Sequence, residues 1–304
     1  MTSLLMITGF LGAGKTTLLN RILTEYSPYK VGVIVNEYGS VSVDDALIAG
    51  HGTKVTSLKN GSIFCACIKG DFIDALIEMS SLQLDYLFIE TSGLADPSNM
   101  ETILEGAVKA GGQPYRYLGA VCVADAVFFT RHVMVLPALA SQIAYSGAVI
   151  INKTDLISPG QLLVVENTVA DINPSAVIFR AVRCDIPVFA LAESCRMNRV
   201  PAETTNTQTG RLRAVTLRTG EIIKQTDFQD FIREIAPSAY RIKGFCRTDS
   251  GGLFISAVND MIESVSCAMP LKTELVIISS VGISIISKII RAAEKYFSIP
   301  PEIK

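Results

Sequence analysis

Short apolar runs alternate with amphipathic stretches along residues 3–182. Between the runs, apolar residues recur at helical spacing, as at Leu18, Ile22 and Leu23, which would lie on one face of a helix. Strands that alternate with helices predict a doubly wound α/β fold whose sheet is mostly parallel. The strands are expected at Ser3–Thr8, Lys30–Val35, Leu84–Glu90, Leu118–Ala124, Gly147–Asn152 and Ala176–Val182.

Two helix starts carry capping signals. Asp96 precedes Pro97, and Ser158 precedes Pro159 with Gln161 at the position of a capping box. Ser and Asp side chains accept hydrogen bonds from the first N–H groups of a helix, and proline fits its first position. We therefore expect one helix to begin at each proline.

A polar stretch rich in Thr and Asn follows the alternating pattern and contains Pro201. Such composition is typical of a linker. We therefore predict a first domain at residues 1–195, a linker at 196–211 and a smaller second domain at 212–304.

The second domain shows a different pattern. A helix is expected from Thr226, with Gln229 at the capping-box position, and a later helix should reach Phe297. These elements predict a smaller α+β domain at the C-terminal end, with an antiparallel sheet and helices on one face. Its strands are expected at Leu212–Arg218, Tyr240–Arg247, Gly252–Val258 and Thr273–Ser279.

The 304 residues are 49% hydrophobic and 18% charged, with a formal net charge of -2. Because acidic and basic residues are mixed along the chain, we expect no nucleic-acid partner and no membrane partner. The apolar stretch at residues 275–290 contains serines and Lys288, so it falls short of a membrane span. No basic segment precedes the first apolar run, which argues against a signal peptide and for a cytoplasmic protein. The seven cysteines then favour free thiols or metal ligands over disulfides.

The first apolar run leads into Gly-Phe-Leu-Gly-Ala-Gly-Lys-Thr-Thr at residues 9–17, which contains the complete Gly-x-x-x-x-Gly-Lys-Thr pattern. Glycines let successive N–H groups turn toward phosphate oxygens, and the helix start adds the positive end of its dipole. Lys15 is expected to reach the outer phosphates and Thr16 to offer its hydroxyl to Mg²⁺. The flanking strand and helix favour a nucleotide site over an empty glycine-rich turn. The residues assigned to it are Gly9, Gly12, Ala13, Gly14, Lys15, Thr16 and Thr17.

A second nucleotide motif, Asn152-Lys153-Thr154-Asp155, follows an apolar strand at the sheet edge where such folds bind ligands. Asp155 can accept hydrogen bonds from both N1–H and the exocyclic amino group of guanine, a pair that adenine lacks. Asn152 and Lys153 would brace the loop and cover the base. Asn and Asp are also frequent in turns, so the tetrapeptide alone is ambiguous. Together with the phosphate loop it favours GTP and GDP over adenine nucleotides.

Between these motifs, an apolar strand delivers Glu90 and then Gly93. We expect Glu90 to hold Mg²⁺, directly or through water, and the Gly93 N–H to contact the terminal phosphate. Leu94 stands where many small signalling GTPases have a glutamine that orients the attacking water. Slow intrinsic hydrolysis is therefore expected.

Four segments in this order, residues 9–17, 36–39, 90–97 and 152–155, resemble the CobW/HypB/UreG group of P-loop GTPases and its CobW-like branch in particular. Arg-Ile-Lys-Gly at residues 241–244 looks like that branch's Arg-x-Lys-Gly segment. The resemblance implies a GTP-driven metallochaperone or maturation factor. Members handle zinc, nickel or cobalt for a client metalloenzyme or cofactor-dependent protein, often as a homodimer.

The resemblance also places Glu37 and Asp44 in the first switch segment. It implies that one of them positions the attacking water, as a catalytic residue, or responds to metal. On residue type alone, both are explained at least as well as exposed acids in a turn.

The metal-binding segment departs from the family pattern. CobW-like proteins carry Cys-x-Cys-Cys after Asn-Gly, whereas this chain retains Cys65 and adds Cys67. Two thiolates one residue apart can hold a transition metal such as Zn²⁺ or Cu⁺, but tetrahedral zinc requires about four ligands. Glu37, a second protomer, the client or water would supply the rest. Two small half-buried thiols are an equally good interpretation. The remaining cysteines lack ligand spacing and are interpreted as structural: Cys122, Cys184, Cys195, Cys246 and Cys267.

Three functions compete at this point. The leading one is a slow Mg²⁺-dependent GTPase that couples its nucleotide state to passing a metal or metal cofactor to a client through Cys65 and Cys67. The second is a regulatory module whose GTP controls docking onto an enzyme, such as a corrinoid-dependent one, with no metal carried. A small-molecule kinase is the third, although such enzymes need an acceptor pocket and usually lack the guanine motif. The sequence leaves the client, the metal and the oligomeric state open.

Overall fold

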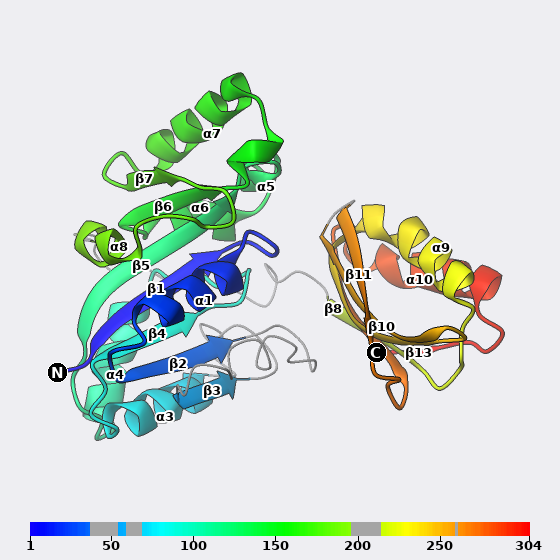
Figure 1. The fold of residues 1–304 in the computed structure, drawn as a ribbon, viewed down its shortest axis with the longest axis horizontal. Helices are drawn as coiled ribbons and strands as arrows, with labels where there is room; N and C mark the ends of the chain where they lie inside the picture. Colours follow the sequence, from blue (N-terminus) through cyan, green and yellow to red (C-terminus); the bar gives the residue numbers. More distant parts are fainter. Residues whose placement is uncertain (37–53, 59–68, 196–213, 259–260) are drawn as a thin grey trace. The chain divides into compact units, whose positions relative to one another are not determined.

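The computed structural model describes residues 1–36, 54–58, 69–195, 214–258 and 261–304, and these form two compact units (Figure 1). Among the described residues, the first unit ends at Cys195 and the second begins at Ala214. The linker predicted at 196–211 lies outside the described residues. Four site predictions also fall there: Glu37, Asp44, Cys65 and Cys67.

The first unit contains a seven-stranded sheet in the order β3-β2-β4-β1-β5-β6-β7, and every neighbouring pair is parallel. This confirms the doubly wound α/β fold. Its edge strand β3 is a strand that the hydrophobic pattern does not predict. The strands are β1 (Ser3–Gly9), β2 (Val31–Asn36), β3 (Lys54–Leu58), β4 (Tyr86–Glu90), β5 (Arg116–Asp125), β6 (Ala148–Asn152) and β7 (Val177–Arg180).

Helices cover both faces of this sheet (Figure 1), because alternate strand residues point to opposite sides and both sets are apolar and buried. Leu5 and Ile7 of β1 belong to a core with α1 and α8, whereas Leu4 and Met6 belong to a core with α3 and α4. A third core joins β5 and β6 to α5, α6 and α7. The helices are α1 (Lys15–Glu25), α3 (Lys69–Ser80), α4 (Met100–Lys109), α5 (Phe129–Val133), α6 (Pro137–Ala144), α7 (Pro159–Ile172) and α8 (Val188–Ser194).

One of the two predicted helix caps in this unit is confirmed and the other is wrong. Ser158 and Gln161 form the capping box at the start of α7, with Pro159 in its first turn. Asp96 instead accepts a hydrogen bond from the Ser98 N–H at 3.0 Å. This bond closes a turn ahead of the helix, and α4 begins only at Met100, with Asn99 as its N-cap residue.

The second unit is a six-stranded antiparallel sheet in the order β11-β10-β9-β12-β8-β13. Its two long helices share one core with alternate strand residues, so they cover one face, as predicted. Strands β11 and β13 are not predicted by the sequence pattern. The elements are β8 (Ala214–Thr219), α9 (Gln225–Ile235), β9 (Ala239–Thr248), β10 (Gly251–Val258), β11 (Met261–Cys267), β12 (Thr273–Ser279), α10 (Ser284–Tyr296) and β13 (Glu302–Ile303).

The capping box predicted at Thr226 is wrong. Helix α9 begins one residue earlier, at Gln225, and no side-chain cap is present at its N-cap residue, Lys224. The Gln225 N–H instead donates to Asp249 in the β9–β10 turn at 3.0 Å. A residue distant in sequence therefore accepts the hydrogen bond of the first N–H group of this helix.

Strand packing explains why the Arg-Ile-Lys-Gly segment ends in a glycine, Gly244. It lies in β9 with a φ of 156°, and a Cβ there would lie 2.0 Å from the Glu274 carbonyl oxygen of β12. Any side chain would therefore separate two central strands of the sheet. The glycine of this segment has a structural role.

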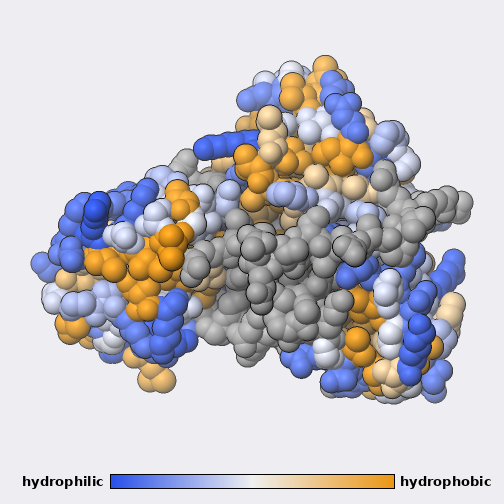
Figure 2. All heavy atoms as spheres, turned by 180° about the vertical axis from the view of Figure 1, so that it is seen from behind, coloured by the Kyte–Doolittle hydropathy of each residue, from blue (hydrophilic) through white to orange (hydrophobic). Residues whose placement is uncertain are grey.

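Hydrophobic side chains reach the surface of both units, as the space-filling view shows in orange (Figure 2). Examples are Leu163 and Val164 on α7, each more than half exposed. Such scattered residues are normal on protein surfaces. Within the described ranges, we find no helix with both the length and the apolar character needed to cross a membrane.

Candidate nucleotide-binding site

The phosphate loop leaves the carboxyl end of β1, at the centre of the parallel sheet. The strand order turns around at this point, because β4 lies on one side of β1 and β5 and β6 lie on the other. Sheets of this kind bind ligands in the crevice that such a reversal opens at the carboxyl ends of the strands. The predicted motifs follow β1, β4 and β6, so the topology brings all of them to this edge.

Two glycines of the loop are required by their backbone angles and by close neighbouring atoms. Gly9 has a φ of 133°, and a Cβ there would lie 2.2 Å from the Val123 carbonyl oxygen of β5. Gly14 has a φ of 114°, and its Cβ would lie 2.5 Å from Nδ2 of Asn152. Because other residues rarely adopt these angles, the loop conformation depends on both glycines.

The helix that follows the loop has an N-terminus suited to an anion. The first N–H groups of any helix lack intrahelical partners. At α1 the N-cap residue is Gly14, and in the described part of the chain no side chain caps it, unlike Ser158 at α7. The uncapped start and the helix dipole together favour a phosphate group at this position.

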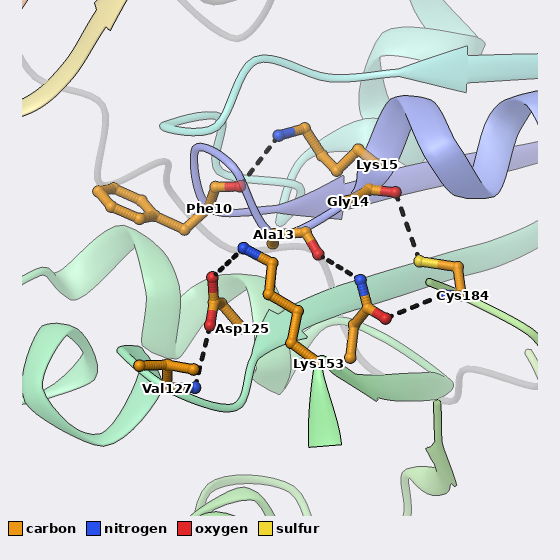
Figure 3. A network of polar contacts seen from close by, with 9 residues as sticks. Phe10, Ala13, Gly14, Lys15, Asp125, Val127, Lys153 and Cys184 are labelled. Atoms are coloured by element: carbon orange, nitrogen blue, oxygen red, sulfur yellow. Dashed lines mark hydrogen bonds and ion pairs between the residues drawn. The ribbon is translucent and has the colours of Figure 1, made fainter. Parts of the chain in front are cut away.

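Lys15 begins α1 and turns back over the loop. Its ammonium group donates to the carbonyl oxygen of Phe10 at 3.1 Å, and its side chain is buried (Figure 3). A buried ammonium group is costly unless it is well paired. The position of Lys15 therefore places a positive charge within the loop that is expected to surround the phosphates.

Thr16 and Glu90 meet across the space between α1 and β4. The Thr16 hydroxyl donates to Oε1 of Glu90 at 2.8 Å, and the Glu90 side chain is buried. Hydroxyl and carboxylate oxygens are the hard ligands that Mg²⁺ prefers. The donor set fits the magnesium site predicted at these two residues. Thr17, by contrast, is exposed.

Asn152 ties the end of β6 to the phosphate loop. Its Nδ2 group donates to the Ala13 carbonyl at 2.8 Å, while its Oδ1 atom accepts from the Cys184 N–H at 2.9 Å. The Cys184 thiol in turn donates to the Gly14 carbonyl at 3.4 Å (Figure 3). Burial raises the pKa of Cys184 to about 12, so the thiol keeps its proton at neutral pH. These bonds link the loops at the ends of β1, β6 and β7.

Arg21 fastens the loop after β7 to helix α1. Its Nε group donates to the Arg183 carbonyl and its Nη1 group to Oδ1 of Asp185, both at 2.9 Å. Arg183 and Cys184 are consecutive residues with φ of 51° and 53°, in the left-handed region. Such a backbone is unfavourable for residues other than glycine, so the surrounding hydrogen bonds hold it in place.

Lys153 extends from the same loop toward β5. It has a φ of 64°, and its ammonium group lies 2.7 Å from Oδ2 of Asp125 (Figure 3). Oδ1 of Asp125 accepts from the Val127 N–H, so the carboxylate is itself fixed. The pair holds the Lys153 side chain along the edge of the sheet.

Asp155, the residue predicted to select guanine, lies in the short helix η2 (Thr154–Leu156). Its side chain is exposed. Thr154 anchors η2, because its N–H and hydroxyl both donate to the Ala181 carbonyl. The carboxylate therefore stands on a fixed turn and faces solvent.

Gly93 follows Glu90 in a tight turn, in which the Ala95 N–H donates to the Ser92 carbonyl at 3.0 Å. A Cβ at Gly93 would lie 2.6 Å from the Leu11 backbone nitrogen of the phosphate loop. The turn and the loop are therefore in direct contact, as expected if Gly93 is to reach a terminal phosphate.

Sequence reasoning missed several residues that build this site. Asp125 carries a faint signal, because it ends an apolar strand at the carboxyl edge of the sheet. Arg21 and Cys184 carry none, since a basic residue in an amphipathic helix and an isolated cysteine are common. Among the residues that the structure describes, no three His, Cys, Asp or Glu side chains are grouped so that they could hold a metal ion.

The parallel sheet, the phosphate loop at its central strand and the acid at the neighbouring strand define a P-loop nucleotide-binding domain. Residues 3–180 match the family model described as CobW/HypB/UreG, nucleotide-binding domain. The chain belongs to this family, which confirms the resemblance seen in its motifs.

Named relatives share part of the chain. The zinc chaperone YjiA of Escherichia coli is 36% identical over 188 residues, which cover 60% of this chain and 58% of that protein. The zinc-regulated GTPase metalloprotein activator 1 of Dictyostelium discoideum is 28% identical over 223 residues, or 60% of this chain and 46% of that protein. The chain thus spans about half the length of these relatives. A crystal structure of Zn(II)-bound YjiA GTPase from E. coli aligns with 97% of this chain and 98% of its own at 23% identity, with a TM-score of 0.49.

Proposed function

We propose that this protein binds GTP and GDP with Mg²⁺ and slowly hydrolyses GTP. The observation that carries the proposal is the pair of hydrogen bonds that the Asn152 side chain makes with Ala13 and Cys184, called here the Asn152 joint. These bonds connect a loop suited to phosphates with a loop suited to guanine. Membership in the CobW/HypB/UreG family supports it. The relatives named as GTPases point the same way.

The phosphates would be bound by the N–H groups of residues 9–17 and by Lys15, whose ammonium group would leave the Phe10 carbonyl for phosphate oxygens. Thr16 and Glu90 would hold Mg²⁺, an ion that neutralises the negative charge developing on the phosphates during hydrolysis. Gly93 would donate its N–H to the terminal phosphate. Asp155 would accept from guanine.

Hydrolysis is proposed to be slow because of Leu94. This side chain is buried and apolar, at the position where a glutamine would orient the attacking water. By resemblance to the family, Glu37 or Asp44 is the residue proposed to orient the attacking water instead. Removing both carboxylates, as Glu37→Gln with Asp44→Asn, should abolish the remaining hydrolysis and leave GDP affinity intact.

The nucleotide state is proposed to control delivery of a metal or metal cofactor to a client metalloprotein in the cytoplasm, where free thiols persist. The names of the relatives, a zinc chaperone and a zinc-regulated metalloprotein activator, support zinc as the cargo. Cys65 and Cys67 are the proposed thiolate ligands. Two cysteines leave a tetrahedral shell incomplete, which suits transfer and allows a second protomer to add ligands.

Calorimetry tests nucleotide binding. With Mg²⁺ present, GTP and GDP should each release binding heat, and ATP should bind far more weakly; equal binding of ATP would refute the proposed base recognition. Released phosphate then measures hydrolysis. Zinc affinity, measured with a GTP analogue, with GDP and without nucleotide, tests the coupling, because equal affinities in the three states would exclude it.

A regulatory module that carries no metal is favoured by one observation, the retention of a single cysteine from the family's Cys-x-Cys-Cys pattern. The double variant Cys65→Ser, Cys67→Ser separates the two functions. A metal carrier should lose both zinc binding and client activation, whereas a regulatory module should keep client activation.

A further inference from the structure

Gln142 on helix α6 is a fully buried polar residue next to the proposed phosphate-sensing turn. Its Nε2 group donates to the Gly93 carbonyl at 3.3 Å and to the Ala95 carbonyl at 2.9 Å. A buried side-chain amide is costly unless its hydrogen bonds are made. The donor side of Gln142 is therefore committed to this one turn.

The turn is held from two sides. The Ala95 N–H closes it by donating to the Ser92 carbonyl. On one side the phosphate loop touches Gly93 through the backbone of Leu11, and on the other the Gln142 amide binds two of its carbonyls. Its orientation against the phosphate loop is set jointly by Leu11 and Gln142.

Asn173 has a second buried side-chain amide in the same region, and it provides a comparison with a purely structural role. Nδ2 of Asn173 donates to the carbonyls of Ile143 and Ser146 at 2.9 Å, and Oδ1 accepts from the N–H and hydroxyl of Ser175. Both ends of that amide are satisfied. By contrast, Oε1 of Gln142 is buried without a hydrogen-bond partner among the described residues.

This contrast indicates what the site requires from Gln142. Leaving a buried acceptor unpaired is unfavourable, and an apolar side chain of similar size would avoid that cost. The position nevertheless holds an amide, and within the described part of the chain its side-chain hydrogen bonds all reach the turn that contains Gly93. Fixing that turn is the one interaction that an apolar residue could not supply.

We propose that Gln142 is a positioning residue for GTP hydrolysis, which holds the Gly93 turn in the orientation that lets its N–H meet the terminal phosphate. The inference rests on the proposed function. The contact between the Gly93 N–H and the terminal phosphate would form only with GTP, because GDP lacks that phosphate. Loss of the Gln142 amide should therefore affect GTP and leave GDP binding alone.

The test compares Gln142→Leu and Gln142→Met, two apolar side chains that fill the same volume, with the control Asn173→Leu. For each full-length protein we would measure the thermal midpoint, the affinities for GDP and for a non-hydrolysable GTP analogue with Mg²⁺, and the single-turnover rate at saturating GTP. Methionine packs adaptably, so it provides a second variant that avoids overpacking.

We expect both Gln142 variants to keep wild-type GDP affinity, bind the analogue more weakly and hydrolyse GTP about 10- to 100-fold more slowly. Asn173→Leu should lower the thermal midpoint and leave both affinities and the rate unchanged. Wild-type rates and an unchanged ratio of GTP-analogue to GDP affinity in either Gln142 variant would overturn the positioning role. Absence of GDP binding to the wild-type protein would instead overturn the proposed function, and the positioning role with it.

Discussion

The side-chain amide of Asn152 donates to the carbonyl of Ala13 at 2.8 Å, although the two residues are 139 positions apart in the chain. The same amide accepts the Cys184 N–H, so one buried side chain connects the ends of β1, β6 and β7. The residue predicted to brace the base loop therefore also supports the phosphate loop. The loops proposed to bind the base and the phosphates are therefore connected through Asn152.

Replacing Asn152 by Ala should weaken nucleotide binding and stability together. The variant leaves the Ala13 carbonyl and the Cys184 N–H without their partner, and each unsatisfied buried group costs about 1–3 kcal/mol. Calorimetry with GDP and a denaturant titration measure the two effects. The control Ser158→Ala removes the cap of α7, which should cost about 1 kcal/mol of stability and leave GDP affinity unchanged. Unaltered GDP affinity in Asn152→Ala would mean that the joint does not support the nucleotide.

Asp155→Asn should change which purine is preferred. The amide keeps one acceptor for N1–H but faces the guanine amino group with a second donor, whereas xanthine presents an oxygen there. We expect GDP affinity to fall by about 1.5–3 kcal/mol and xanthosine diphosphate affinity to rise. Competition binding with both nucleotides measures this. Asp171→Asn, at another exposed acid, is the matched control and should change neither. An unchanged preference in Asp155→Asn would show that this carboxylate does not read the base.

The parts of the site that could be predicted are those with a local sequence signal. Residues 9–17 and 152–155 carry their chemistry within one short segment, and the apolar runs before them fix the strands that position them. Gln142 has no such signal, because its partners, Gly93 and Ala95, become neighbours only through packing of α6. The hydrogen bond from the Cys184 N–H to Asn152 likewise depends on a tertiary contact and carries no local sequence signal.

The missed strands and caps have related causes. Strand β11 has mostly exposed residues, so no buried face marks it in the sequence. Among the described strands, β3 pairs with β2 alone, at the edge of its sheet. The predicted caps at Asp96 and Thr226 failed because the helices begin at other residues. Helix α4 starts at Met100, beyond the turn at Asp96, and α9 starts at Gln225, which places Thr226 inside its first turn.

Gly14→Ala should abolish nucleotide binding. The added methyl group would meet Nδ2 of Asn152 at 2.5 Å, and the φ of 114° is strained for alanine. Either the loop or Asn152 must move, and both carry the site. Gly160→Ala is the matched control, since its Cβ meets nothing within 4 Å and alanine favours helix α7. Retention of GDP binding by Gly14→Ala, measured by calorimetry, would contradict the required closeness of the loop to Asn152.

Stability should fall at alkaline pH because of buried thiols such as Cys122. Burial raises the pKa of this thiol from 9.0 to about 12. The unfolded chain therefore loses the proton first, so the stabilisation is complete below pH 9 and is lost as the pH rises toward 12. One such thiol contributes a slope of about 1.4 kcal/mol per pH unit in that interval.

Denaturant titrations at pH 8, 9 and 10 measure this slope. Cys122→Ala should be less stable at pH 8 but should lose less stability than the wild type as the pH rises. Cys267→Ala should change the slope less, since that thiol is only partly buried. Parallel pH profiles for the wild type and Cys122→Ala would show that the thiol does not titrate as its burial requires.

Because β1 lies between β4 and β5, the proposed site residues reach this edge of the sheet from two sides. Glu90 arrives from one flank, and the Asn152 segment arrives from the other, by way of β6. The residues proposed to select the purine thus follow β6, whereas Glu90, the acid proposed to hold Mg²⁺, ends β4. The proposed guanine contact at Asp155 and the proposed Mg²⁺ contact at Glu90 can therefore be altered by separate substitutions.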